Sequence, residues 1–182
     1  MSALDDLRDA IPDAARDLKL NLQAVLAESS LSPAQRWGTA VAAALASRNR
    51  PLREAILGEA RAQVDGAVVD DAIAAAALMG MNNVFYRFRH FVGRDVYKEK
   101  PARLRMNRLA KPAGSKADFE LFSLAVSAIN GCESCVKAHE HAVLEGGLTE
   151  DNVLDAVRIA SVIHGAAVAL DLAPADTLAP AG

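Results

Sequence analysis

The chain has little of what a β-sheet core, a disulfide scaffold or a membrane span requires. Only 4% of its 182 residues are aromatic, and it contains two cysteines. Sheet cores are enriched in aromatic and β-branched side chains, whereas small side chains such as alanine let helices approach closely. A bilayer span needs about 20 apolar residues, and the nearest uncharged run, 72–81, is too short. We therefore expect an all-α fold, a single-domain helical bundle.

The charge balance excludes some classes of partner. The net charge is −3, which argues against nucleic acid, because nucleic-acid binding calls for a clustered basic face. The stretch 98–111 is locally basic, but charge runs are usually solvated connections. The N-terminal residues are charged and lack an apolar core, so we expect no secretory signal. We predict a cytoplasmic protein without a membrane contact.

Helix-start and helix-stop signals follow one another along the chain. Ser32-Pro33 and Thr149 are typical N-terminal residues of helices, and Asn130-Gly131 is a typical stop. The expected helices cover about 12–26, 33–46, from 51 onward, 70–84, 116–130, 132–145 and 150–170. No alternating run predicts a strand. We expect residues 1–172 to form one all-helical domain and residues 173–182 a flexible tail.

The two halves of the chain resemble each other and suggest a diverged internal repeat. Residues 36–42 align with 121–127, and residues 70–73 align with 150–153. In this alignment Ser47 and Arg50 occupy the positions of Cys132 and Cys135. Only the second half would then carry reactive groups.

Both cysteines lie in one motif, Cys132-Glu133-Ser134-Cys135, and His139 follows it. In a helix, Cys135 and His139 are i, i+4 neighbours, so an imidazole lies beside one sulfur. The motif falls at a helix start, where unpaired N–H groups and the helix dipole favour a thiolate. A thiol pair that can close into a disulfide beside an imidazole indicates thiol redox chemistry.

Two other interpretations of the motif remain open. The cysteines can be small buried side chains of an alanine-rich core. Cys132, Cys135, His139 and His141 also resemble zinc ligands by residue type. One short helix cannot wrap four ligands around a tetrahedral ion, and the chain has no other cysteine. We expect no metal, and a zinc-binding module without enzymatic activity is the alternative.

Position along the helix predicts different roles for the two sulfurs. We expect Cys132 to be the more exposed sulfur and Cys135 to lie deeper, closer to the imidazole of His139. Cys135 would then attack a peroxide, and Cys132 would condense with the resulting sulfenic acid. His139 would relay a proton to the departing oxygen. By position alone, Glu120 is a carboxylate near the N-terminus of its helix, where its negative charge interacts favourably with the helix dipole.

Several segments resemble the alkyl hydroperoxidase D family, from about residue 5 to residue 170. They are Phe119-Glu120-Leu121, residues 125–132, Cys135, His139-Glu140-His141, residues 79–87, residues 18–22 and residues 35–38. The resemblance implies an all-helical homotrimer in which Cys135 is peroxidatic, Cys132 resolves, and Glu120 and His139 relay protons. The chain departs from some relatives at Ser134, where they have histidine.

The same resemblance implies an antioxidant function. The protein would take electrons from a dihydrolipoyl group on a lipoylated dehydrogenase-complex acyltransferase and would bind no cofactor tightly. It would pass the electrons to an AhpC-type peroxiredoxin, and it would also reduce organic hydroperoxides directly. A related decarboxylase of the carboxymuconolactone decarboxylase superfamily is the other alternative, although it would need no thiol pair.

Overall fold

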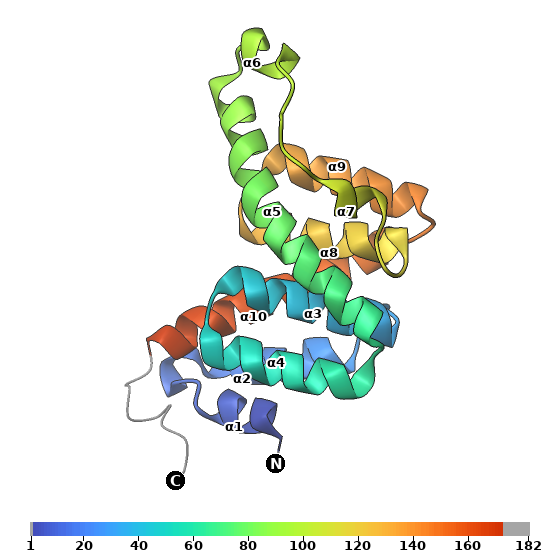
Figure 1. Ribbon diagram of the computed structural model, residues 1–182. Helices are drawn as coiled ribbons and strands as arrows, with labels where there is room; N and C mark the ends of the chain where they lie inside the picture. The colour runs from blue at the N-terminus through green and yellow to red at the C-terminus, as the bar shows by residue number, and fades with distance from the viewer. Residues whose placement is uncertain (1, 173–182) are drawn as a thin grey trace.

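Residues 2–172 are described by a computed structural model, and over this range the chain is a bundle of α-helices without a β-strand (Figure 1). The helices are α1 (Ala3–Asp9), α2 (Arg16–Ala27), α3 (Pro33–Ser47), α4 (Arg50–Gln63), α5 (Gly66–Val92), α6 (Asp95–Glu99), α7 (Asn107–Ala110), α8 (Lys116–Ile129), α9 (Glu133–Glu145) and α10 (Glu150–Asp171), with a 3-10 turn η1 (Asp13–Ala15) before α2. The all-α prediction is confirmed. The predicted tail, 173–182, lies outside the described residues.

The core centres on α3 and α8, two adjacent helices that are buried on nearly every side. Residues 37–44 of α3 and 119–127 of α8 are all buried. Both helices contact α5 and α10, while α4 packs on α3 and α9 packs on α8. The helices α3 and α8 approach closely at Gly38, where an added Cβ would lie 2.1 Å from Phe122 Cζ and would force the ring to move. Helix α9 is positioned by its packing on α8 and α5.

Local capping signals located most helix starts correctly. Ser32 and Thr149 each form a capping box, and the Ser115 hydroxyl accepts a hydrogen bond from the third residue of α8. The N-terminal prediction differs in detail. Pro12 precedes the 3-10 turn, and the regular helix begins only at Arg16.

Helix α5 is longer than the sequence predicted at both ends. We expected it to begin at Asp70 or Asp71, but it begins at Gly66, with Asp65 at the N-cap, and continues to Val92. Asp71 does not cap the helix because its buried carboxylate accepts hydrogen bonds from the loop that precedes α8. The last turns of α5, together with α6, project beyond the rest of the molecule (Figure 1).

Helices α5 and α10 are long and apolar enough to cross a membrane by length and composition. The mean hydropathy of their most apolar 18-residue windows is 1.2 and 1.7. About 39% and 44% of these windows are buried inside the molecule. Long core helices of soluble proteins meet the same criteria, so two such helices indicate a membrane span only weakly. The absence of a membrane contact stays a prediction.

The two predicted halves correspond to two runs of helices, α3–α5 and α8–α10, and each run begins at a serine N-cap. The second helix of each run has Asn49 or Cys132 as its N-cap. Counting from these caps, Asn49 takes the place of Cys132, and Leu52 takes the place of Cys135. The predicted pairing of the cysteines with Ser47 and Arg50 is therefore wrong. The alignment based on side-chain similarity paired the wrong positions of the two halves, whereas the helix ends show which positions correspond.

Candidate active site

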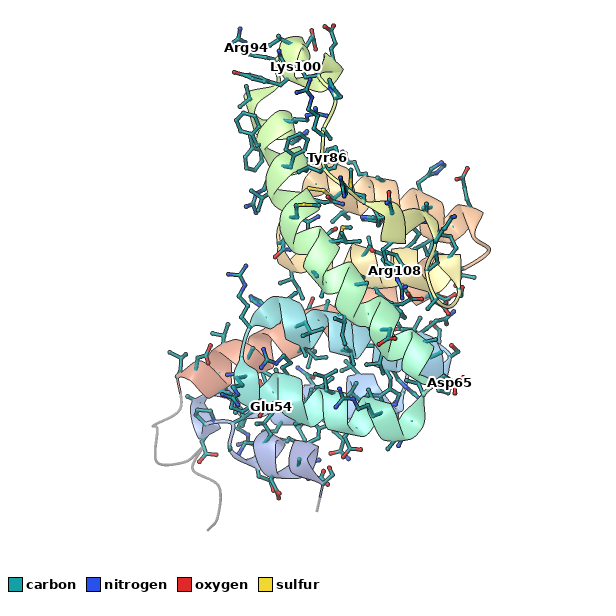
Figure 2. The ribbon with its side chains drawn as sticks, in the orientation of Figure 1. Glu54, Asp65, Tyr86, Arg94, Lys100 and Arg108 are labelled. Carbon is teal, nitrogen blue, oxygen red and sulfur yellow. A yellow bond between two sulfur atoms is a disulfide. The ribbon has the colours of Figure 1, made fainter. Side chains whose placement is uncertain are left out.

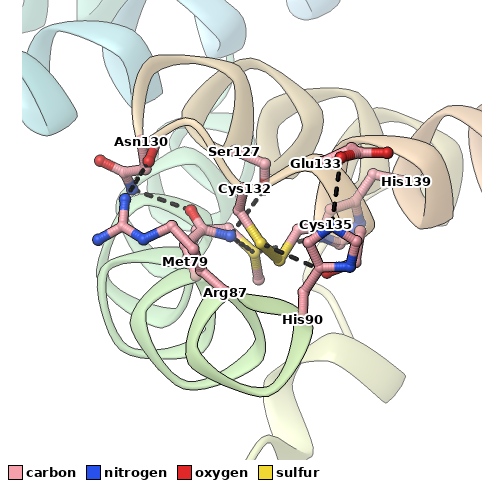
Figure 3. The surroundings of a disulfide bond; sticks show 11 residues. Met79, Arg87, His90, Ser127, Asn130, Cys132, Glu133, Cys135 and His139 are labelled. Carbon is pink, nitrogen blue, oxygen red and sulfur yellow. Dashed lines mark hydrogen bonds and ion pairs between the residues drawn. A yellow bond between two sulfur atoms is a disulfide. The ribbon is translucent and has the colours of Figure 1, made fainter. Parts of the chain in front are cut away.

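The two cysteines lie at the turn that joins α8 to α9 (Figure 3). After α8 ends, Gly131 takes a φ of +65°, a left-handed conformation that glycine adopts without strain. Cys132 is the N-cap of α9, and Cys135 lies in its first turn. Their sulfurs are joined in a disulfide with an S–S distance of 2.09 Å. The motif therefore forms the intramolecular dithiol–disulfide pair that its spacing indicated.

The sequence predicted the wrong order of burial for the two sulfurs. Cys132 is 0% exposed, and Cys135 is 7% exposed. The prediction treated α9 in isolation, but α5 packs against α9 and the turn before it. Cys135 lines a pocket together with His139. Cys135 is therefore the sulfur that a small molecule in the pocket can reach.

Two side chains of α5 hold the turn that carries the cysteines. Asn83 Nδ2 donates to Ser127 Oγ at 2.9 Å, and Asn83 Oδ1 accepts from Asn130 Nδ2 at 2.9 Å. Arg87 donates to the carbonyl oxygen of Asn130 at 2.5 Å. The backbone N–H of Cys132 donates to the Ser127 carbonyl at 3.1 Å. These bonds fix the first sulfur against α5 (Figure 3).

A chain of three polar side chains leads from the surface to the pocket. His139 Nδ1 lies 2.6 Å from Glu120 Oε2, and both side chains are largely buried. The other carboxylate oxygen, Glu120 Oε1, accepts a hydrogen bond from Lys116 Nζ, which also donates to the Leu109 carbonyl at 2.6 Å. Glu120 and His139, which were named as candidates from the sequence, are therefore in direct contact. The carboxylate therefore orients the imidazole through Nδ1.

The environment of Glu120 keeps its carboxyl ionised. Burial alone would raise the pKa of this carboxyl, but the hydrogen bonds from His139 and Lys116 outweigh burial. The pKa of Glu120 is lowered below its ordinary value as a result. A negatively charged carboxylate therefore lies beside His139 Nδ1.

The second nitrogen of His139 lies next to a buried thioether. His139 Nε2 is 3.2 Å from Met79 Sδ, and Met79 is 1% exposed. A thioether sulfur is only a weak acceptor. With Nδ1 engaged by Glu120, Nε2 is the nitrogen available to exchange a proton with groups in the pocket.

A pocket of about 250 Å³ opens at the disulfide. Its lining residues are Asn82, Tyr86, Met106, Leu109, Ser134, Cys135, Ala138 and His139. Figure 2 shows Tyr86 on α5 next to the yellow disulfide bond. Much of the lining is apolar, and it includes the Cys135 sulfur and the His139 imidazole. The space fits a small organic molecule.

The wall of the pocket formed by α7 is anchored by Asp71, which lies in the second turn of α5. Arg108 donates to Asp71 Oδ1 at 2.7 Å, and the N–H groups of Ala113 and Gly114 donate to the same carboxylate at 2.9 Å and 2.7 Å. Asp71 is 2% exposed, so these bonds are shielded from water. Helix α7, which carries Leu109, is thereby held at the pocket that Cys135 lines.

The side chains weighed as zinc ligands do not gather at one point. Cys132 and Cys135 are bonded to each other, and His141 is an exposed residue 3.3 Å from Glu145. In the part of the chain from 2 to 172, no cluster of three or more His, Cys, Asp or Glu side chains is arranged to hold a metal ion.

Comparison with known proteins defines the family. Residues 96–176 match the Carboxymuconolactone decarboxylase family. A protein named alkyl hydroperoxide reductase AhpD from Anaeromyxobacter dehalogenans (strain 2CP-C) is 68% identical over 173 residues, which are 95% of this chain and 93% of the relative. Proteins of the same name from Rhodospirillum centenum and Brucella suis are 51% and 47% identical, over 93% and 96% of this chain and 91% and 99% of their own lengths. This chain belongs to the AhpD family.

Sequence reasoning missed two residues that contact the Glu120–His139 pair of this AhpD-family protein. Lys116 lies four residues before Glu120, a spacing that could have identified it as a partner. Met79 has no local signal, because the packing of α5 on α9 brings it to His139. Ser134, the residue of the motif just before Cys135, lines the pocket.

Proposed function

We propose that this AhpD-family protein is an antioxidant thiol oxidoreductase that reduces organic hydroperoxides through its Cys132–Cys135 pair. The observation that carries the proposal is the disulfide at the pocket, with Cys135 and His139 in the same lining. A decarboxylase would need no thiol pair. The names of the relatives agree with a peroxide-reducing role.

The reaction divides into three balanced steps. The Cys135 thiolate attacks the terminal oxygen of ROOH and becomes a sulfenic acid, while RO⁻ leaves and takes a proton to give ROH. The Cys132 thiol then attacks the sulfenic sulfur, so that a disulfide forms and water leaves. A dithiol donor finally reduces the disulfide by thiol–disulfide exchange and is itself oxidised to a cyclic disulfide.

The reachable sulfur is the one that suits the attacking role. Cys135 lines the pocket, whereas Cys132 is completely buried beneath α5. His139 Nε2 can give a proton to the leaving oxygen, and Glu120 stabilises the charged imidazole through Nδ1. This geometry supports Cys135 as peroxidatic, Cys132 as resolving, and Glu120 and His139 as the relay.

The electron donor in this proposal is a dihydrolipoyl group of a lipoylated dehydrogenase-complex acyltransferase. A dithiol suits a buried disulfide, because its second thiol resolves the mixed disulfide without a second encounter. The electrons would also pass to an AhpC-type peroxiredoxin. A reducing cytoplasm would keep the donor available.

We further propose that the protein assembles as a homotrimer through the projecting end of α5. Large apolar side chains are exposed there, with Val84 60%, Phe88 49% and Phe91 73% exposed. Exposed apolar surface of this kind marks sites of association. Light scattering at micromolar concentration tests the assembly, and a monomer would contradict it.

Turnover of cumene hydroperoxide with dihydrolipoamide tests the proposed function. We expect activity in the wild type and none above background in Cys135→Ser. Cys132→Ser should accumulate a sulfenic acid that a dimedone-type probe labels, because its resolving thiol is gone. Labelling of Cys135→Ser instead of Cys132→Ser would reverse the two roles. A wild type that leaves the hydroperoxide intact would overturn the proposed function.

A further inference from the structure

The pocket is lined by one buried polar side chain with an oxygen that no other residue from 2 to 172 bonds. Asn82, on α5, is 4% exposed and lines the pocket with Cys135 and His139. Its Oδ1 atom is buried and has no hydrogen-bond partner within the described chain. Nor does any atom of residues 2–172 accept a hydrogen bond from its Nδ2.

Asn83, the next residue of α5, is an asparagine with a structural role. Asn83 is 1% exposed, and both atoms of its amide are bonded, to Ser127 and to Asn130. Asn83 therefore has a structural use, because it holds the turn that carries the cysteines. Asn82 has no comparable use, although it is buried almost as deeply.

A buried amide oxygen without a partner destabilises a fold, because the oxygen loses its bonds to water and gains none. An apolar side chain of similar size at position 82 would avoid that loss. Such unpaired polar groups are found where a ligand supplies the missing bonds. The face of Asn82 that lines the pocket is where a ligand beside Cys135 would lie.

We propose that Asn82 binds the peroxy group of the alkyl hydroperoxide and holds it for attack by Cys135. This role rests on the proposed function. The alkyl group of the substrate lies against Met106 and Leu109, the apolar side of the pocket. Asn82 is thus a catalytic residue of the peroxide step, in addition to the cysteines and the relay.

The chemistry of the two groups is complementary. An amide has a donor and an acceptor side by side, and a hydroperoxide likewise carries an O–H donor next to an acceptor oxygen. Oδ1 accepts from the terminal O–H, and Nδ2 donates to the inner oxygen. A thiol is a weak donor and acceptor by comparison, so the dithiol donor gains little from this amide.

The hydrogen bond from Nδ2 matters most as the O–O bond breaks. The electron pair of that bond moves to the inner oxygen, while the terminal oxygen joins the Cys135 sulfur. Asn82 stabilises the negative charge on the inner oxygen until His139 Nε2–H protonates it and the alcohol leaves. A donor aimed at charge that develops in a transition state contributes about 10²–10³ in rate.

The test separates the two half reactions in the full-length protein. Reduced wild type, Asn82→Ala and Asn82→Leu are mixed with cumene hydroperoxide, quenched with an alkylating agent, and their free thiols are counted against time. Their disulfide forms are separately reduced with dihydrolipoamide. The melting temperature and the alkylation pKa of Cys135 are measured for each variant, with Asn83→Ala as the matched structural control.

We expect the oxidation step of both Asn82 variants to be slower by about 10²-fold, while reduction by dihydrolipoamide is unchanged. The melting temperature of Asn82→Leu should equal or exceed that of the wild type, whereas Asn83→Ala should melt lower. Equal slowing of both half reactions, no slowing, or a raised Cys135 pKa that accounts for the loss would each overturn the role. A wild type inert to the hydroperoxide overturns the proposed function itself, and the role of Asn82 with it.

Discussion

The two helix junctions of the repeat show how one architecture serves stability in one half and reactivity in the other. At the α3–α4 junction, Asn49 Oδ1 caps the N–H of Leu52 at 2.9 Å, and its Nδ2 donates to Asp171 at 2.6 Å. At the α8–α9 junction, Cys132 occupies the N-cap and makes no capping hydrogen bond with its side chain. Both turns use one left-handed residue, Arg48 in the first and Gly131 in the second.

The two halves also differ in the side chains along the helices on either side of each junction. Counted from the caps, the positions of Glu120, Cys135 and His139 correspond in the first half to Trp37, Leu52 and Ile56, which are all buried apolar residues. The first half fills its junction with packed side chains. The second half leaves the N–H groups at the start of α9 without a side-chain cap, so they can stabilise a thiolate. The polar and sulfur-containing side chains of the second half thus stand at positions where the first half has packed or capping side chains.

The largest effect should come from removing the polar pair that has no counterpart in the first half. We expect Glu120→Gln and His139→Phe each to slow hydroperoxide turnover by about 10²–10⁴-fold, the usual contribution of positioned acid–base groups. Because the two act as one unit, the double variant should be little slower than the slower single variant. The alkylation pKa of Cys135 should rise in His139→Phe. Multiplicative losses with an unchanged alkylation pKa would mean that the two residues act separately, outside any relay.

Exchanging the capping chemistry should have an intermediate effect on stability. Asn49→Ala should lower the free energy of unfolding by about 1–2 kcal/mol, because a side-chain cap is lost. Cys132→Ser should not lower the stability relative to the reduced wild type, since serine adds a hydroxyl that can cap α9. Urea denaturation under reducing conditions measures both variants. Equal destabilisation of Cys132→Ser and Asn49→Ala would contradict the proposal that only the first junction is stabilised by its N-cap side chain.

The smallest effect should come from Lys116, because its side chain is 54% exposed and its ion pair is screened by water. The pKa of Glu120 in the folded protein is lowered, so its charge stabilises the fold above about pH 4 and this stability is lost as the pH falls through the lower, folded-state pKa. In Lys116→Met that folded-state pKa should move back toward the ordinary value, so the stability lost on acidification should be smaller and the loss should be complete at a higher pH.

Stability measured from pH 3 to 7 checks the role of Lys116, and Lys137→Met is the matched control. Lys137 pairs with the exposed Glu133 at 2.5 Å, outside the relay. Its removal should leave the dependence on Glu120 intact. Identical pH profiles for Lys116→Met and the wild type would show that Lys116 does not act on Glu120.

Sequence reasoning succeeded where the determining interaction is local. The caps at Ser32, Ser115 and Thr149 bind within one helical turn, and the sequence predicts their helices closely. It failed where a distant segment decides the outcome. Asp71 looked like a helix start, but its carboxylate binds the loop near Arg108, more than thirty residues further on.

The site shows the same division between local and distant determinants. The spacing of Cys132 and Cys135 predicted their disulfide, because three residues at a helix start bring the sulfurs together. Their order of burial was predicted wrongly, since the covering helix α5 lies far away in the sequence. The contact between Glu120 and His139 was expected only from the family resemblance. It depends on how α8 and α9 pack, which periodicity does not specify.

The burial of one sulfur and the exposure of the other have a kinetic consequence. Cys135 lines the pocket and Cys132 is buried, so in the proposed reaction the oxidising and the reducing substrate would approach the same sulfur through the same opening. The two substrates cannot occupy it together, so each product must leave before the other substrate enters. The proposed turnover would then be a substituted-enzyme cycle in which an excess of either substrate competes with the other. The protein itself would store the electron pair between the two substrates.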